Sequence, residues 1–537
     1  MIWLKEINGT LRGYSFFRRA YRPYFIAIGL TIIAVYSLYI FLPIGTYDDY
    51  ERAWNYNLFP QTYGRDLFSQ HLNDGRAFTG LFLWLFFKPA SISYFGIYRI
   101  INLLLLIPFS FGIFSFLAKE MKLATACMLT IVICLLPSFS IMFYFVSLMG
   151  VFAGGILSRE SVLMLKDVVS IRHISSKFVK RIIFACLLLL TAIQFYQPIA
   201  MFYWFFAAII LLSNRNFGIK TFLGKVLVYG VVFLFSLAMA YLVMRAAPLL
   251  TNMPNRARAS LIDWQILLPK ILWFLSDPIP NSVNFFLFYS IPKSILICAA
   301  VIIFSGIYFW FDGSILRRFL KSFVILMLLP LSYFPNIIVT ENWASYRSMI
   351  ALSALWVILI FFSTKGYLKQ IVKLEPYVSK LGRFVLMLWT LLAIILSIYN
   401  SAVYLILPAF LEHRIIHSEI IEMDVKAGDT IYVSMPNYFD SSSPYFYGDE
   451  FGIPTTAYPW GAANLTKLVL KEFGFSPEEI QVEIINDLEK IKSDEPIVHY
   501  LYLHQISRYQ LRGSMYPIER VKIMVDAIFQ RIDAVFW

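Results

Sequence analysis

The stretch FIAIGLTIIAVYSLYIFLP (residues 25–43), followed closely by GTYDDYER (residues 45–52), decides the class of this protein. The first part is close to the roughly 20 apolar residues that one α-helix needs to cross a bilayer. Five basic residues and one acid precede it: Lys5, Arg12, Arg18, Arg19, Arg22 and Glu6. The run is too long for a signal-peptide core, so we expect an uncleaved first span with a cytoplasmic N-terminus.

The composition of the whole chain agrees with this start. Of its 537 residues, 59% are hydrophobic, 18% aromatic and only 15% charged, and the mean hydropathy is +0.68. Soluble domains carry about 25% charged residues, so a soluble globular protein is excluded. Long apolar runs also exclude an outer-membrane β-barrel, whose strands alternate. The four cysteines lie in apolar runs, so no disulfide framework or thiolate metal site is expected.

Ten further apolar runs predict a membrane body of about eleven transmembrane helices. They centre on residues 96–118, 123–140, 142–158, 182–196, 198–213, 226–247, 290–311, 321–339, 346–363 and 384–407. The loops that this count assigns to the cytoplasm hold 24 Lys/Arg and six acids. The net charge of +13 therefore reflects topology, and no nucleic-acid partner is needed to explain it.

The chain divides into a membrane body, residues 1–407, and a tail, residues 408–537. Outer loops 45–95 and 248–289 and the tail are expected on one face of the membrane, the periplasmic one. The tail has 11 Lys/Arg and 19 Asp/Glu, a shift that marks a water-soluble unit. Its patterns predict strands at 430–433 and 480–484 and helices at 461–473 and 518–529, so we expect a small α/β domain.

The first outer loop holds the candidate catalytic residues. Asp48 and Asp49 come directly after the first span, where a pair of carboxylates should face a polar cavity and not lipid. Either could act as a general base. The alternative is helix capping at the start of a helix through residues 50–56, which needs only one carboxylate. Residues 72–87 predict a helix that lies in the membrane interface.

Other polar residues on this face are candidates for binding. The predicted donor or phosphate ligands are Arg52, Arg65, Arg76 and Arg347, since guanidinium groups suit phosphate; interface anchoring or solvation are the alternatives. The predicted cavity residues are Glu51, Asp66, His71, Tyr196, Gln197, Arg256, Arg258 and Glu341. For Gln197 the alternative is a turn, because Pro198 can begin the next helix.

The tail adds aromatic residues, of which Tyr445, Tyr447 and Trp460 are predicted to contact an acceptor; packing within the tail or on the membrane interface is the alternative. His413 and His417 have a spacing that metal sites use, but no third ligand accompanies them, so no metal site is expected. The chain has no Walker loop, nucleophile elbow or zincin helix, and no cofactor is predicted.

Asp48-Asp49-x-x-Arg52 after the first span, Gly64-Arg65, the Tyr196-Gln197 step and the multi-span body resemble polyprenyl-phosphate-sugar-dependent glycosyltransferases of the GT-C fold. Within these the chain resembles the bacterial serotype-converting O-antigen glucosyltransferases of the Gtr type. The family often continues its Gly-Arg with proline and leucine, whereas this chain has Asp66-Leu67.

The resemblance implies transfer of a sugar, glucose in that family, from undecaprenyl phosphate to lipid-linked O-antigen or lipopolysaccharide. It also implies a location in the bacterial inner membrane, with membrane lipid, a separate flippase and a donor-synthesising enzyme as partners. Two alternatives stay open: a lipid-linked-sugar flippase or exporter without transferase activity, and an O-antigen polymerase.

Overall fold

The computed structural model describes residues 19–89, 91–166, 176–252, 260–285, 293–370, 375–434, 451, 455–476, 479–485 and 498–502. The first half of the chain contains η2 (Arg19–Tyr21), α2 (Arg22–Phe41), α3 (Tyr47–Leu58), α4 (Tyr63–Asn73), α5 (Ala77–Phe86), η3 (Ile92–Tyr94), α6 (Phe95–Leu117), α7 (Leu123–Cys134), α8 (Pro137–Tyr144), η4 (Val146–Leu148), α9 (Val151–Leu165), α10 (Ser176–Phe195), α11 (Gln197–Ala200), α12 (Phe202–Ser213) and α13 (Ile219–Thr251).

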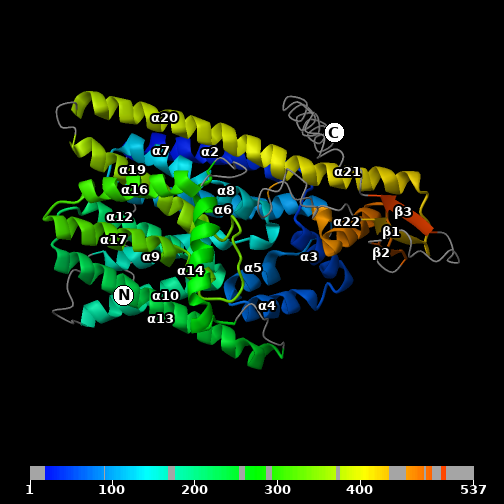
Figure 1. Cartoon of the computed structure of the whole chain (residues 1–537). Helices are drawn as coiled ribbons and strands as arrows, with labels where there is room; N and C mark the ends of the chain where they lie inside the picture. The colour runs from blue at the N-terminus through cyan, green and yellow to red at the C-terminus, as the bar shows by residue number, and fades with distance from the viewer. Residues whose placement is uncertain are drawn as a thin grey trace.

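The second half contains η6 (Trp264–Ile266), α14 (Leu267–Ser276), α15 (Pro278–Val283), α16 (Lys293–Trp310), α17 (Ile315–Ser332), α18 (Phe334–Ile337), α19 (Ile350–Gln370), α20 (Glu375–Asn400), η8 (Ser401–Ile406), α21 (Leu407–Glu422), β1 (Thr430–Ser434), η9 (Thr455–Ala457), α22 (Pro459–Glu472), β2 (Gln481–Ile485) and β3 (Val498–Tyr502). Most long helices run along one axis as a bundle, while α14 lies across them (Figure 1).

The bundle is built for a membrane. Within the described residues, seven helices are long and apolar enough to cross one: Arg19–Phe41, Ile92–Leu117, Val146–Leu165, Ser176–Phe195, Ile219–Thr251, Ile350–Gln370 and Lys380–Glu422. An eighth span results if α7 and α8, bent by 54°, are one broken span. Leu227, Leu234 and Leu242 of α13 are 56–58% exposed, as lipid-facing side chains are expected to be. The predicted helical membrane protein is confirmed.

The predicted count of eleven spans is not confirmed. Run 123–140 forms the bent pair, and runs 198–213 and 290–311 form shorter apolar helices, Gln197–Ser213 and Ser294–Trp310. Run 321–339 is divided between α17 and α18. Prolines explain two of the breaks: Pro137 and Pro335 each stand in the first turn of a new helix, where a missing N–H costs nothing.

Small residues bring some helices close together. Gly366 of α19 approaches the backbone of Gly306 in α16 so closely that any Cβ on Gly366 would collide with the Gly306 carbonyl oxygen. Contacts between small residues are a common way for membrane helices to pack, because lipid provides no hydrophobic drive between them.

The last span continues well past residue 407. Helix α20 runs through the π-helical turn η8 into α21, and the whole helix, Lys380–Glu422, has 43 residues. At 1.5 Å per residue this is about twice the roughly 30 Å thickness of a bilayer core. Its far end therefore carries the tail away from the bundle (Figure 1).

The described part of the tail is a three-stranded parallel sheet, in the order β2-β1-β3, packed with α22. The predicted strands at 430–433 and 480–484 and the helix at 461–473 are confirmed as β1, β2 and α22; strand β3 was not predicted. Ile431 and Val433 of β1 point into an apolar core that includes Leu465 and Val469 of α22. The predicted helix at 518–529 lies outside the described residues.

This unit contacts helix α3 in the segment 45–95. Helices α3 and α22 lie side by side at the end of the molecule beyond the bundle (Figure 1). Lys471 Nζ donates a hydrogen bond to Asn57 Oδ1, and Lys467 Nζ lies 5.6 Å from the centre of the Trp54 ring. The fold thus brings α3 and α22 together, although they are about 400 residues apart in the chain.

Candidate functional site at the start of helix α3

A capping box defines where α3 begins. The N-cap is Thr46, whose hydroxyl oxygen accepts a hydrogen bond from Asp49 N at 3.3 Å, while Thr46 N donates to Asp49 Oδ2 at 3.0 Å. Such reciprocal bonds satisfy N–H groups that a helix start otherwise leaves without partners. The capping alternative is therefore correct for Asp49.

Asp49 also links α3 to the turn that follows α8. Val146 N donates to Asp49 Oδ2 at 3.1 Å and Ser147 N donates to Oδ1 at 2.8 Å. The residue has no exposed surface. With three backbone N–H groups on its two oxygens, the carboxylate of Asp49 is committed to holding α3 and η4 together.

Arg99 of α6 lies directly behind this link and was missed by the sequence analysis. It is fully buried, and its guanidinium donates to the carbonyl oxygens of Tyr39 at 3.0 Å, Ile44 at 2.7 Å and Tyr144 at 2.9 Å. Asp49 attracts it electrostatically. A buried guanidinium is stable only with such partners, so Arg99 fixes the ends of α2 and α8 around the loop before α3.

Asp48 is different from its neighbour. It is half-buried, and within the described residues no hydrogen bond or ion pair engages its carboxylate. The pair thus consists of one structural carboxylate, Asp49, and one, Asp48, that none of the described residues holds through a hydrogen bond.

Charged groups converge on Tyr63 beside Asp48. Burial raises the pKa of the Tyr63 phenol to about 12, and the charges of Arg52, Glu51 and Asp48 act on it as well. Arg52 is half-buried and Glu51 is exposed. Tyr63 belongs to α4, so this face is formed jointly by α3 and α4.

Arg347 reaches the same region from the other half of the chain. Its guanidinium lies 4.4 Å from the centre of the Phe145 ring and 5.7 Å from that of Trp343. Phe145 contacts Tyr47, the residue before Asp48, with ring centres 6.2 Å apart. Of the four predicted arginines, Arg347 and Arg52 are brought to the start of α3.

Arg76 lies in a separate cluster with the predicted Tyr196 and Gln197. Its Nε donates to Gln197 Oε1 at 3.2 Å, and its guanidinium lies 4.8 Å from the centre of the Tyr196 ring. Gln197 Nε2 donates to the carbonyl oxygens of Asp74 and Gly75 at 3.2 and 3.1 Å. These contacts tie the turn between α4 and α5 to the step between α10 and α11, which agrees with the turn role considered for Gln197.

The remaining predicted residues are scattered. Arg65 and Glu341 are exposed, Asp66 is half-buried, and His71 is buried. Glu341 contributes its carbonyl oxygen, which accepts a hydrogen bond from buried Lys270. Arg256, Arg258, Tyr445 and Tyr447 lie outside the described residues. His413 Nε2 pairs with Glu472 Oε2 at 3.1 Å, and no group of three potential metal ligands occurs in the described part of the chain.

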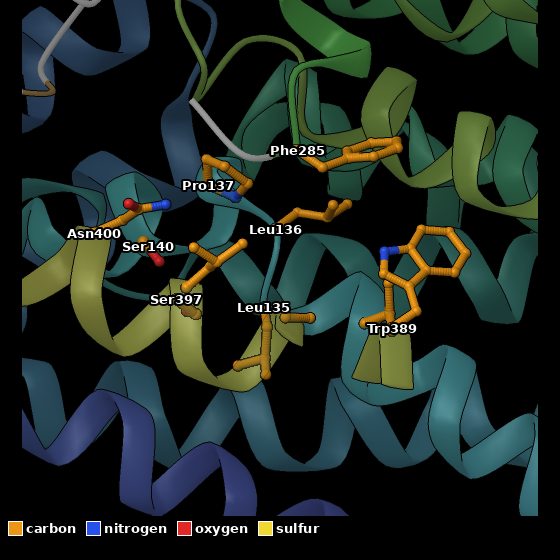
Figure 2. Close-up of a pocket in the computed structure, with 11 residues that line it drawn as sticks. Leu135, Leu136, Pro137, Ser140, Phe285, Trp389, Ser397 and Asn400 are labelled. Atoms are coloured by element: carbon orange, nitrogen blue, oxygen red, sulfur yellow. The ribbon is translucent and has the colours of Figure 1, made fainter. Parts of the chain in front are cut away.

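A cavity inside the bundle lies where α7 breaks into α8, against α20 (Figure 2). Ser140 and Asn400 lie toward one end of it and Trp389 toward the other (Figure 2). Its volume of about 20 Å³ suits one water molecule and not a substrate. The start of α3 is therefore the better candidate site.

The chemistry of this candidate site follows from its own residues. An open carboxylate can accept a proton, guanidinium groups can bind phosphate, and aromatic faces can bind apolar faces of a ligand.

Comparison with known proteins gives no match: no protein-family model, no curated protein and no solved structure corresponds to this chain.

Proposed function

We propose that the protein is a membrane glycosyltransferase that moves a sugar from a polyprenyl-phosphate donor to a lipid-linked surface glycan, with Asp48 as the general base. Undecaprenyl-phosphate glucose is the proposed donor, and O-antigen or a related glycan is the proposed acceptor. The proposed location is the bacterial inner membrane, with the start of α3 and the tail on the periplasmic side.

The observation that carries the proposal is the contrast between Asp48 and Asp49. Three backbone N–H groups hold the carboxylate of Asp49, while no hydrogen bond from the described residues holds that of Asp48, the residue before it. A general base must be free to take a proton from its substrate and must be held in place by a rigid support. Asp49 and Arg99 supply that support, and Asp48 is the free group.

The reaction is a single displacement. The acceptor hydroxyl oxygen attacks the anomeric carbon and forms the new C–O bond, while the bond from that carbon to the phosphate oxygen breaks. The proton of the hydroxyl passes to Asp48, and the electron pair of the broken bond leaves with the lipid phosphate. One base suffices for this step, and the configuration at the anomeric carbon is inverted.

The departing phosphate needs positive hydrogen-bond donors. Arg52 and Arg347 are the proposed ligands, because Arg52 acts together with Asp48 on Tyr63, and Arg347 lies over Phe145, whose ring contacts Tyr47. Arg76 is less suited, since Gln197 and Tyr196 already engage its guanidinium.

The charges at the other end of the bundle support the proposed orientation. Asp312, after α16, pairs with Lys369 and with Arg215 at 3.3 Å, and Lys166 pairs with Glu120 at 3.5 Å. These residues belong to the loops that hold most of the chain's Lys and Arg, and such loops favour the cytoplasm.

The flippase alternative is less well supported. A flippase needs charged residues that line a path through its spans. Arg99, near the start of α6, is fully buried and donates to three carbonyl oxygens, so its charge holds the fold and does not line a path. A polymerase would carry out similar chemistry and is distinguished by its product.

The test is sugar transfer by the purified full-length protein. We expect that incubation with undecaprenyl-phosphate glucose and lipopolysaccharide adds single hexoses, detected by mass spectrometry, and that Asp48→Asn abolishes the addition. Glu51→Gln is the matched control, because Glu51 is an exposed acid on the same helix. Elongated glycan chains in place of single additions would indicate a polymerase, and transfer by Asp48→Asn at the wild-type rate would contradict the base assignment.

A further inference from the structure

Three aromatic side chains form a surface where α3 meets α22. The ring centres of Tyr47 and Tyr458 are 4.3 Å apart, those of Tyr458 and Trp460 are 5.0 Å apart, and those of Tyr47 and Trp460 are 6.0 Å apart. Tyr47 and Tyr458 are half-buried, and Trp460 is 43% exposed. These rings therefore do not form an internal core, because the largest of them presents a face to solvent.

A buried carboxylate fixes this surface from below. Glu412 of α21 has no exposed surface and accepts hydrogen bonds from Thr455 N at 3.1 Å, Thr456 N at 3.3 Å and both threonine hydroxyls. These bonds hold η9, the turn that leads directly into Tyr458 and α22. Charge-assisted hydrogen bonds are the strong ones, so Glu412 sets where Tyr458 and Trp460 lie.

A glycine allows α22 to come close enough to α3. A Cβ on Gly461 would lie 2.9 Å from Tyr47 Cβ and would collide with the Thr455 carbonyl oxygen. Only a residue without a side chain fits here. The contact between Tyr47 and the Tyr458–Trp460 pair therefore depends on glycine at position 461.

Polar groups border the aromatic surface. Asp48 follows Tyr47 in the chain, and Arg347 is reached from Tyr47 through Phe145. The tail that carries Tyr458 and Trp460 lies beyond the end of the bundle (Figure 1). A ligand on this surface would thus meet aromatic faces on one side and a carboxylate and a guanidinium at the edge.

We propose that Tyr47, Tyr458 and Trp460 form a subsite for a pyranose ring of the acceptor glycan. A pyranose has an apolar C–H face that packs on aromatic rings and hydroxyl groups at its rim that need polar partners. That the ligand is the acceptor rests on the proposed function. With this subsite the tail becomes part of the site, and the bound sugar lies beside Asp48.

Binding and transfer are measured separately to test this subsite. The binding probe is soluble polysaccharide released by mild acid from the lipopolysaccharide of the bacterium that carries the chain, added to full-length protein in lipid nanodiscs. We expect Trp460→Ala to weaken binding by about tenfold, because the largest of the three aromatic faces that pack on the sugar is removed. Trp460→Phe keeps an aromatic face and should recover most of the affinity.

Two controls keep the outcomes distinct. Trp84→Ala removes a similarly exposed tryptophan on α5 and should leave binding unchanged. Asp48→Asn should still bind the probe, because the three aromatic rings remain, but should not transfer sugar. Wild-type affinity in Trp460→Ala, or no binding by the wild type, overturns the subsite even if sugar transfer is found. If Trp460→Ala loses binding and neither the wild type nor any variant transfers sugar, the proposed reaction is wrong and the subsite is supported.

Discussion

The division of roles between Asp48 and Asp49 leads to a paired prediction. Changing each aspartate to asparagine alters one atom and one charge, so the two variants differ only in the surroundings of the side chain. We expect Asp49→Asn to lower stability strongly and Asp48→Asn to lower activity strongly.

The contacts of Asp49 set the size of the stability loss. Oδ1 accepts from Ser147 N, and Oδ2 accepts from Thr46 N and Val146 N. An asparagine has one acceptor oxygen, so at least one of these N–H groups would face an NH₂ group. A hydrogen bond to a charged group is worth about 1.5–3 kcal/mol, and the charge that attracts Arg99 is removed as well. We therefore expect a total loss of about 3 kcal/mol.

The surroundings of Asp48 predict the opposite pattern. Its carboxylate is half-buried and engages none of the described residues through a hydrogen bond, so Asp48→Asn should change stability by less than about 0.5 kcal/mol. Loss of a general base lowers the rate by about 10²- to 10⁴-fold. Transfer by Asp48→Asn should therefore fall by this factor in protein of normal abundance.

The assay combines thermal unfolding in detergent, abundance in membranes and sugar transfer per folded molecule. Two results would refute the reasoning. If Asp49→Asn unfolds at the wild-type temperature, the amide bonds to Asp49 do not stabilise the fold. If Asp48→Asn transfers sugar at the wild-type rate while Asp49→Asn is folded and inactive, the two roles are reversed.

Three further predictions concern other parts of the molecule. Burial lowers the pKa of Lys270 to about 8, so an NMR titration of ¹³C-methylated lysines should show a midpoint there for Lys270. The contribution of Lys270 to stability should be present above the ordinary lysine pKa of 10.5 and lost as pH falls through about 8. A midpoint near 10.5 would contradict the burial of Lys270. Glu412→Gln should speed hydrogen exchange at Thr455 and Thr456, because an amide cannot accept the four hydrogen bonds that their N–H and hydroxyl groups donate to Glu412. Unchanged exchange would show that Glu412 does not hold η9. A reporter fused after Trp537 should be active only in the periplasm, and cytoplasmic activity would remove the proposed orientation.

The parts of the fold that the sequence predicts well are those with strong local patterns. The first span, the strand at 430–433 and the helix at 461–473 are marked by apolar runs or by alternation, and such signals do not depend on distant residues. The number of spans was harder to predict, because hydropathy does not show that Pro137 bends one run into two helices.

The candidate site was only partly predictable for a similar reason. The acid pair is visible in the sequence, but the difference between Asp48 and Asp49 depends on Val146 and Ser147, about 100 residues away. Arg99 did leave a signal, since a single arginine inside an apolar run implies a buried partner. Glu412 left none, because its partners Thr455 and Thr456 meet it only through the path of the tail.

The buried cations favour a fixed catalytic frame over a moving transport path. Lys225 Nζ donates to the Lys166 carbonyl oxygen at 2.7 Å and Lys321 Nζ to the Arg215 carbonyl oxygen at 2.9 Å, and both lysines are almost fully buried. Arg99 is held in the same way near the opposite end of the bundle. Alternating access would have to break such charge-assisted bonds at each end in turn. A rigid bundle that presents Asp48 at one face has no such cost, which is why transfer of a sugar at that face suits this arrangement better than its export.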